Sequence, residues 1–374
     1  KGFLRLSSFY ELSWRNPGRI PTLPQNQNFA TAKNLLVFYN FQYTYYNASM
    51  RFWTLITILC ILLCCNKTDY SVKAQTVIKQ DTEILVQSLA VPEPLYADPQ
   101  AVFNASLETW RQKQYEVYRL SIGNNLICIS FLNYEEQRNF FWRLTYFSNQ
   151  DKENYVIHPI NYYAGMHSYN ANDYSSEDLA NFFNQLNKQN LVPEPGEALL
   201  LQMALSYKII AQSNKGYFPL TGAIISFSRE TEIKQRKRYL VHETMHGLFY
   251  TIPVLRKEII REVNNLPADE LAFWKIFLKH KGELDGRPGL SGYNIENQFL
   301  FVNEIFAHTM QCGYAALDDY FWNTYVTRMK KLFPETSDFL RKLEANKRTM
   351  FANLFTRFAE LLKKYSVIEN GELF

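Results

Sequence analysis

Two histidines four positions apart, with a glutamate directly after the first, stand in the stretch YLVHETMHGLFYTIP, residues 239–253. On a helix, side chains at i and i+4 project from the same side, so His242 and His246 can present two imidazoles to one metal ion. Glu243 would lie beside that ion, close enough to act on a water molecule without binding the metal. A pair of neutral imidazoles suits zinc, and the HExxH spacing therefore indicates a zinc site.

The competing interpretation is a helix whose histidines are only hydrogen-bonded in the core or at its edge. Burying two histidines and a carboxylate among apolar neighbours is costly unless each has a partner, and a metal ion supplies one. We therefore expect a metal site here.

A catalytic zinc also needs a third protein ligand and an open position. The best supplier is the predicted helix FVNEIFAHTMQ, in which Glu304 follows His246 by 58 residues. Asn303, Glu304 and Ala307 give this segment the pattern NExxA. Together the two segments resemble the gluzincin metallopeptidases, in which a glutamate from a later helix, often written NExxA or NExxxD, completes the zinc site. The resemblance covers two short segments and their order, not the whole chain.

This resemblance implies that His242, His246 and Glu304 bind zinc and that Glu243 is the general base. It also implies that Asn303 helps to orient the site from outside the ligand set. The activity implied is hydrolysis of peptide bonds in peptides or proteins.

The chain departs from the family at one position. Many thermolysin-like members have an aspartate four residues after the ligand glutamate, to hold the first histidine, whereas this chain has His308. Either another carboxylate takes that role, Asp318 or Asp319, or His308 has a role of its own. It is a candidate third ligand in place of Glu304, and a candidate donor to the oxyanion of the tetrahedral intermediate. Tyr293 is a second candidate donor, although a packing role fits it equally well.

Composition and charge describe a globular protein with a neutral body. The chain has 374 residues, 47% of them hydrophobic, and a formal net charge of +4. Residues 1–65 hold six Lys and Arg residues and one acid, so residues 66–374 carry 34 basic and 35 acidic residues, a balance of −1. Nothing in that body indicates a nucleic-acid partner.

The N-terminal region has the layout of an export signal. Residues 1–49 show no periodicity and read as an upstream segment, and Met50 opens MRFWTLITILCILLCCN, with one positive charge and a short apolar run. We expect a signal peptide over 50–65, then a tether over 66–95. The sequence LLCCN resembles a loose bacterial lipobox, which predicts lipid attachment at Cys65 and a membrane anchor outside the cytoplasm; a plain signal peptide without lipid is the alternative.

The remaining pattern predicts an α+β fold, with strands and helices mixed first and helices alone later. We expect an α/β subdomain over 96–200 and a zincin-like catalytic region over 201–374. The strand TGAIISFSRE, residues 221–230, is predicted to be either the upper edge of a substrate cleft or an ordinary core strand. Cys128 and Cys312 can form at most one disulfide. The expected strands are YEVYRLSI and NLICISFL. In the segment 167–190 a helix is expected to follow Asp173, Ser175 or Ser176, the candidate N-caps. The other expected helices include 133–150, 196–212, 232–250, 256–267, 269–282, 298–313 and a long closing helix over 338–365.

The sequence thus predicts an exported, lipid-anchored zinc metallopeptidase of a bacterium. The alternative is a surface lipoprotein that keeps the zincin fold but serves as a binding or adhesion module. The intact Glu243 argues against that alternative, because a purely structural site has no need of a base.

Overall fold

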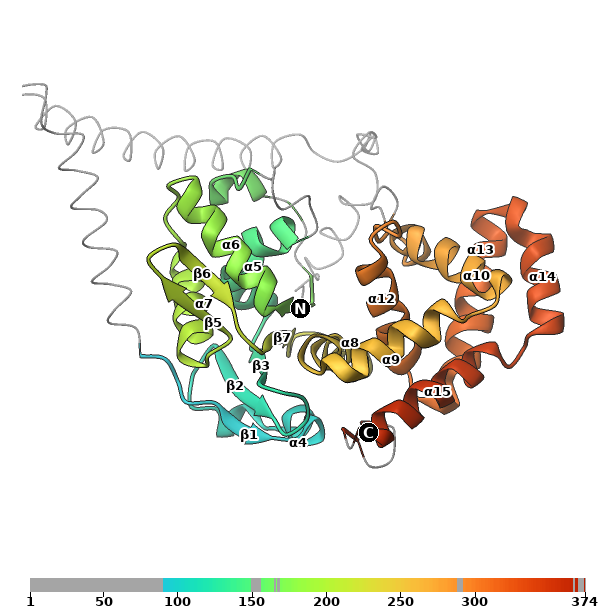
Figure 1. The fold of residues 1–374 in the computed structure, drawn as a ribbon, viewed down its shortest axis with the longest axis horizontal. Helices are drawn as coiled ribbons and strands as arrows, with labels where there is room; N and C mark the ends of the chain where they lie inside the picture. Colours follow the sequence, from blue (N-terminus) through green and yellow to red (C-terminus); the bar gives the residue numbers. More distant parts are fainter. Residues whose placement is uncertain are drawn as a thin grey trace, which may run out of the picture. The chain divides into compact units, whose positions relative to one another are not determined.

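The described residues form an α+β fold, as the sequence predicts, with a small mixed sheet and many helices (Figure 1). The signal peptide and most of the tether lie outside these residues. Within the part that is described, no helix has both the length and the apolar character needed to cross a bilayer. A computed structural model describes residues 90–148, 156–164, 166, 169–287, 292–365, 367–368 and 373.

The main sheet has five strands in the order β1-β2-β3-β7-β4. β1 is parallel to β2 and β3 is parallel to β7, whereas β2–β3 and β7–β4 are antiparallel pairs. β3 and β7 are apolar and buried along their whole length, as expected of strands covered on both faces. The strand bounds are β1 Leu95–Ala97, β2 Tyr115–Leu120, β3 Leu126–Phe131, β4 Ala171–Ser175 and β7 Ala223–Ser228, and a separate hairpin pairs β5 Ile210–Ser213 with β6 Gly216–Pro219.

The two faces of this sheet belong to two cores, because side chains alternate along a strand. Ile127 and Ile129 of β3 join the core that contains α5, α6 and α7. Leu126 of β3 and Ile225 of β7 join the core that contains α8 and the later helices. The helices of the first core are α5 Tyr134–Ser148, α6 Ser176–Lys188 and α7 Pro195–Ser206. The short helix α4 Pro99–Asn104 contributes Val102 to the second core.

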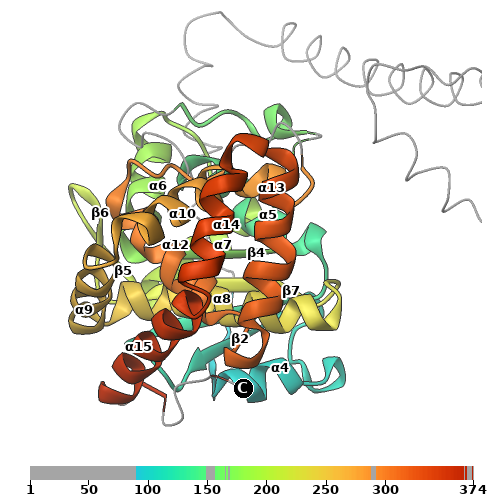
Figure 2. The same cartoon turned by 90° about the vertical axis from the view of Figure 1, so that its right-hand side faces the viewer.

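The second core is built almost entirely from helices. Figure 2 faces this half of the fold, with α13, α14 and α15 in front of α8. These helices are α8 Ile233–Thr251, α9 Pro253–Asn264, α10 Ala268–Lys279, α11 Lys281–Leu284, α12 Gln298–Met310, the π-helix η4 Asp319–Val326, α13 Thr327–Leu332, α14 Ser337–Asn346 and α15 Met350–Lys364. Short 3-10 turns are η1 Leu107–Thr109, η2 Ile160–Tyr163, η3 Tyr314–Ala316 and η5 Pro334–Thr336.

The strand before the histidine helix is a core strand and not the edge of a cleft. β7 lies between β3 and β4, so both of its edges are already hydrogen-bonded. On the β7 side the sheet ends with β4, which comes from a segment in which the sequence indicated only a helix start. The main sheet also takes strands from both sides of residue 200, so the segments 96–200 and 201–374 share it.

Two predicted helices are shorter than expected. The helix over 196–212 ends at Ser206, Lys208 takes a positive φ of 57°, and the chain continues as β5. The long closing helix is divided into α14 and α15. At that break the Trp322 indole donates to the carbonyl of Arg348 at 3.0 Å, a tertiary contact that the local sequence does not reveal.

The predicted hairpin is confirmed, since β2 and β3 pair in antiparallel register around Gly123 and Asn125, both at positive φ. Cys128 and Cys312 are both free thiols, so the disulfide that the sequence left open is not formed.

Candidate metal centre

Helix α8 carries the two histidines, and its ends follow from the sequence. It contains no proline, and it stops at Thr251 because Pro253 cannot donate the next backbone hydrogen bond. The i, i+4 spacing places the rings of His242 and His246 edge to face, with centroids 4.6 Å apart. Their Nε2 atoms are 3.0 Å apart and both side chains are buried.

Helix α12 brings a carboxylate to the same point. The Asn297 side chain caps this helix by accepting from the backbone of Leu300. Two turns further on, Glu304 places Oε2 3.7 Å from Nε2 of His242 and Oε1 3.7 Å from Nε2 of His246. Two ligands of a tetrahedral zinc lie about 3.3 Å apart, given metal–ligand distances near 2.0 Å. The Nε2–Nε2 distance of 3.0 Å and the two Nε2–Oε distances of 3.7 Å, which involve different oxygens of Glu304, lie on either side of this value.

The donor set also lacks other partners. Nδ1 of both histidines and Oε2 of Glu304 are buried without a hydrogen-bond partner among the described residues. Burial holds the pKa of His242 well below its ordinary value, with His246 adding to the effect, so this ring is in the neutral form that binds metals. Burial raises the pKa of Glu304 to about 7. A buried cluster of this kind could hold a metal ion, and a bound cation would supply a partner for Oε2 of Glu304.

A second carboxylate, which the sequence reasoning missed, lies beside the proposed base. Asp173 of β4 and the side chains of Glu243 and His246 place one atom each within 4.8 Å of one another. Tyr250 of α8 donates its hydroxyl proton to Oδ2 of Asp173 at 2.5 Å. Burial raises the pKa of Glu243 well above its ordinary value, and Asp173 and then Glu304 raise it further. The sequence suggested Asp173 only as a possible N-cap, a role that Ser175 fills.

His308 lies one turn beyond Glu304 on α12, with its Nε2 3.6 Å from Oε2 of Glu304. It is not part of the group that His242, His246 and Glu304 form. Its Nδ1 is 2.8 Å from Nε2 of Gln311, an amide nitrogen that can only donate. Nδ1 therefore accepts, and because burial keeps the pKa of this ring low, the neutral imidazole carries its proton on Nε2. That Nε2 has no hydrogen-bond partner among the described residues, so His308 is oriented as a donor.

The other residues predicted to contribute to the site differ in their distance from the candidate metal ligands. Tyr293 lies near His308, with ring centroids 6.0 Å apart. Asn303 is buried and close enough to His246 to raise that ring's pKa, but its amide atoms have no hydrogen-bond partner among the described residues. Neither aspartate suggested for holding His242 does so: Asp318 pairs with Arg348, and Asp319 accepts from Asn323.

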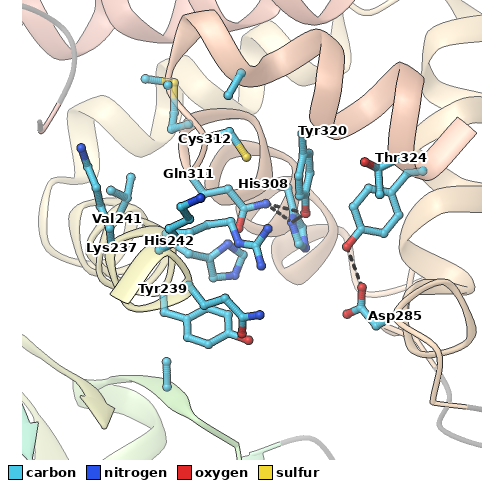
Figure 3. A pocket seen from close by; sticks show the side chains of 18 of the residues that line it. Lys237, Tyr239, Val241, His242, Asp285, His308, Gln311, Cys312, Tyr320 and Thr324 are labelled. Atoms are coloured by element: carbon cyan, nitrogen blue, oxygen red, sulfur yellow. Dashed lines mark hydrogen bonds between the residues drawn. The ribbon is translucent and has the colours of Figure 1, made fainter. Parts of the chain in front are cut away.

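A cavity of about 1050 Å³ opens onto this centre. His242, Glu243 and His308 all line it. Figure 3 shows His242 and His308 facing the same space, with Gln311 and Tyr320 hydrogen-bonded to each other beside His308. The candidate metal centre is therefore buried in the fold but reachable from one side, as a centre that acts on a substrate needs to be.

Compared with known proteins, the chain matches no protein-family model, no curated protein and no solved structure.

Proposed function

We propose that this protein is a zinc-dependent metallohydrolase that cleaves peptide bonds. The observation that carries the proposal is the buried group of His242, His246 and Glu304, whose ligand atoms lie within 4.8 Å of one another, with Glu243 next to His242 on the same helix. These three residues would hold the zinc. Zinc, when bound, lowers the pKa of a water molecule and polarises a carbonyl group.

The residues around the metal supply the proton transfers. Glu243 takes a proton from the attacking water and later gives it to the nitrogen of the leaving amine. His308 donates from Nε2 to the oxygen that gains negative charge, with Tyr293, whose ring centre lies 6.0 Å from that of His308, as a second donor. Asp173 keeps the Glu243 carboxyl in place from strand β4.

The proposed setting comes from the N-terminal sequence. The signal peptide and the lipobox at Cys65 support a protein that acts on peptides or proteins outside the cytoplasm of a bacterium, held at a membrane by lipid. The neutral body of the chain supports no nucleic-acid partner.

The test begins with zinc content. Elemental mass spectrometry of the purified chain, never exposed to chelator, should find about one tightly held zinc per molecule. A peptide library should then be cleaved by the wild type, and Glu243→Gln should keep the zinc and lose cleavage by about 100-fold or more.

Two results would contradict the proposal. A folded protein that takes up no zinc when offered it would leave His242 and His246 as structural histidines. Bound zinc with every measurable activity unchanged in Glu243→Gln would identify a binding or adhesion module instead of a peptidase.

A further inference from the structure

One arginine in the cavity wall has no use in the proposed reaction. Arg238 lies on α8 one turn before His242, so both side chains project from the same side of the helix. It lines the cavity and is half-buried. Among the described residues it makes no ion pair or hydrogen bond. Its contacts are with aromatic rings, its guanidinium carbon lying 5.7 Å from the ring centre of Tyr320 and 5.9 Å from that of Tyr239.

The wall around Arg238 carries more positive than negative charge. Three acidic residues line the cavity: Glu243, Asp285 and Asp319. Six basic residues line it: Lys234, Lys237, Arg238, Lys281, Arg287 and Arg328. The lining of the cavity as a whole is therefore cationic.

The nearby acids do not neutralise Arg238. Asp285 already accepts from Lys281 at 2.5 Å and from the hydroxyl of Tyr325 at 2.6 Å (Figure 3). Asp319 is exposed and accepts from Asn323. The third acid, Glu243, is the proposed base.

The other arginines of the cavity wall have partners. Arg328 donates to the carbonyl of Leu284 at 2.8 Å, and Arg287 also interacts within the protein. Lys281 shares its charge with Asp285, so Arg238 is the guanidinium left for a ligand. A guanidinium held against aromatic rings offers a planar pair of donors, which fits a carboxylate through two parallel hydrogen bonds.

We infer that Arg238 is a substrate-binding residue that recognises a carboxylate near the scissile bond, so that the preferred substrates are acidic peptides. This inference rests on the proposed peptidase function and specifies its substrate class. The carboxylate belongs either to an aspartate or glutamate side chain or to the free C-terminus of the peptide. Both present the same two oxygens to the guanidinium.

Binding is measured with the zinc-loaded Glu243→Gln protein, which does not consume the peptide. The probes are fluorescent hexapeptides that differ only in carrying Glu, Gln or Lys at one position, scanned along the chain, each with a free or an amidated C-terminus. We expect one glutamate position, or the free C-terminus, to tighten binding by about tenfold or more over its neutral counterpart. Preference for glutamate over glutamine assigns the side chain, and preference for the free acid over the amide assigns the C-terminus.

The variant is Arg238→Gln in the same background, with Lys275→Gln as its matched control. Lys275 is exposed on α10 and does not line the cavity. Its replacement by glutamine removes one positive charge, as Arg238→Gln does. Arg238→Gln should abolish the carboxylate preference and leave the affinity for neutral peptides within about twofold, whereas Lys275→Gln should keep the preference. Arg238→Lys preserves the charge and should retain part of it, and it replaces Arg238→Gln if the latter does not fold.

Failure of this inference and failure of the proposed function can be told apart. Equal binding of acidic and neutral peptides overturns the inference, and so does a carboxylate preference that survives in Arg238→Gln. In either case, zinc-dependent cleavage of neutral peptides would still support the proposed peptidase function. A carboxylate preference that depends on Arg238, in a zinc-loaded wild type that cleaves nothing, would uphold the binding site and reject the peptidase.

Discussion

At the scale of single residues, the centre depends on two short helical segments and one strand. α8 supplies His242, Glu243 and His246, α12 supplies Glu304, and β4 supplies Asp173. One atom of each of the three ligands lies within 4.8 Å of the other two, and Oε2 of Glu304 has no hydrogen-bond partner among the described residues. Loss of any one ligand leaves an incomplete tetrahedral face.

Replacing a ligand should therefore remove the metal. We expect His246→Ala to weaken zinc binding by more than about 100-fold, because even residues outside the ligand set change metal affinity by 10- to 100-fold. Competition with a chromophoric chelator measures the affinity. His280→Ala, a half-exposed histidine beside Glu283, is the matched control and should bind zinc as the wild type does. Equal affinities in the two variants would place the zinc elsewhere.

Asp173→Asn should slow the proposed reaction without releasing the metal. The substitution keeps the shape of the side chain but removes the charge beside Glu243. We expect kcat to fall by about 10- to 100-fold, with KM and zinc content little changed. Tyr250→Phe, which removes only the hydrogen bond to Asp173, should cause a smaller loss of kcat. An unchanged kcat in Asp173→Asn would exclude a positioning role for this residue.

Sequence reasoning finds the residues of the centre that are linked by local spacing. His242 and His246 are neighbours on any helix, whatever the rest of the fold does. Glu304 was found only through its resemblance to a known pattern, because 58 residues separate it from His246. Asp173 suggested only a helix cap. The basic run that contains Arg238, residues 234–238, suggested either recruitment of an anionic substrate or lipid or, more often for such runs, a solvated face.

At the scale of elements, the position of α8 on the sheet is set by a close approach at Gly247. A Cβ at this position would lie 2.4 Å from Cδ1 and 2.7 Å from Cδ2 of Leu126 on β3. Leu126 is fully buried, so its side chain has no free space into which it can move. The absence of a side chain at Gly247 lets helix α8 pack directly on the sheet.

Gly247→Ala should destabilise the protein even though it improves helix propensity. In an exposed helix this change stabilises by about 1 kcal/mol. Here overpacking against Leu126 should dominate and lower the free energy of unfolding by about 1–3 kcal/mol. Urea denaturation measures the change. Leu126→Val should restore part of the loss in the double variant, and strictly additive effects would argue against the contact.

Strand β2 begins with a buried carboxylate whose charge should contribute to stability. Glu116 is buried and accepts from the backbone and side chain of Arg111 and from the backbone of Val117. Burial alone would raise its pKa, but these hydrogen bonds outweigh burial and lower the pKa below 4.5. Because the folded pKa is the lower one, this stability is present above about pH 4.5 and is lost as the pH falls through the folded value.

Glu116→Gln should thus reduce the free energy of unfolding at neutral pH by about 1–3 kcal/mol. The difference from the wild type should shrink in denaturation curves taken below pH 4.5. Glu108→Gln, an exposed glutamate nearby, should change stability little at either pH. A constant difference across the whole pH range would reject the electrostatic explanation.

Elements with a long, uniform pattern were predictable, and those decided by distant contacts were not. The apolar runs of β3 and β7 identified them as strands, and α5, α8, α10 and α12 followed from their periodicity. The order of strands, which places β7 inside the sheet and β4 at its edge, is a property of the whole fold. The break before α15 depends on Trp322, which is 26 residues away from its partner Arg348.

At the scale of the whole molecule, the candidate centre joins segments that are far apart in the chain. A ligand that binds only the folded state stabilises it, and zinc at 100 times its dissociation constant would add about 2.7 kcal/mol. We therefore expect chelation to lower the Tm of the wild type in differential scanning calorimetry and zinc to restore it. Glu304→Gln should show a much smaller response, and an equal response would mean that zinc acts at another site.

The burial of α8 affects two exchange rates, that of its backbone amide hydrogens and that of a metal ion bound at the centre. Every residue from Leu240 to Phe249 is buried, in a helix that packs on the sheet on one side and on α12 on the other. Amide hydrogens in such a segment exchange with deuterated solvent only when the whole domain opens, so they should be among the slowest in the chain. A metal ion bound at the centre would, in contrast, have the cavity as its route. It could enter or leave while the backbone of α8 stays closed.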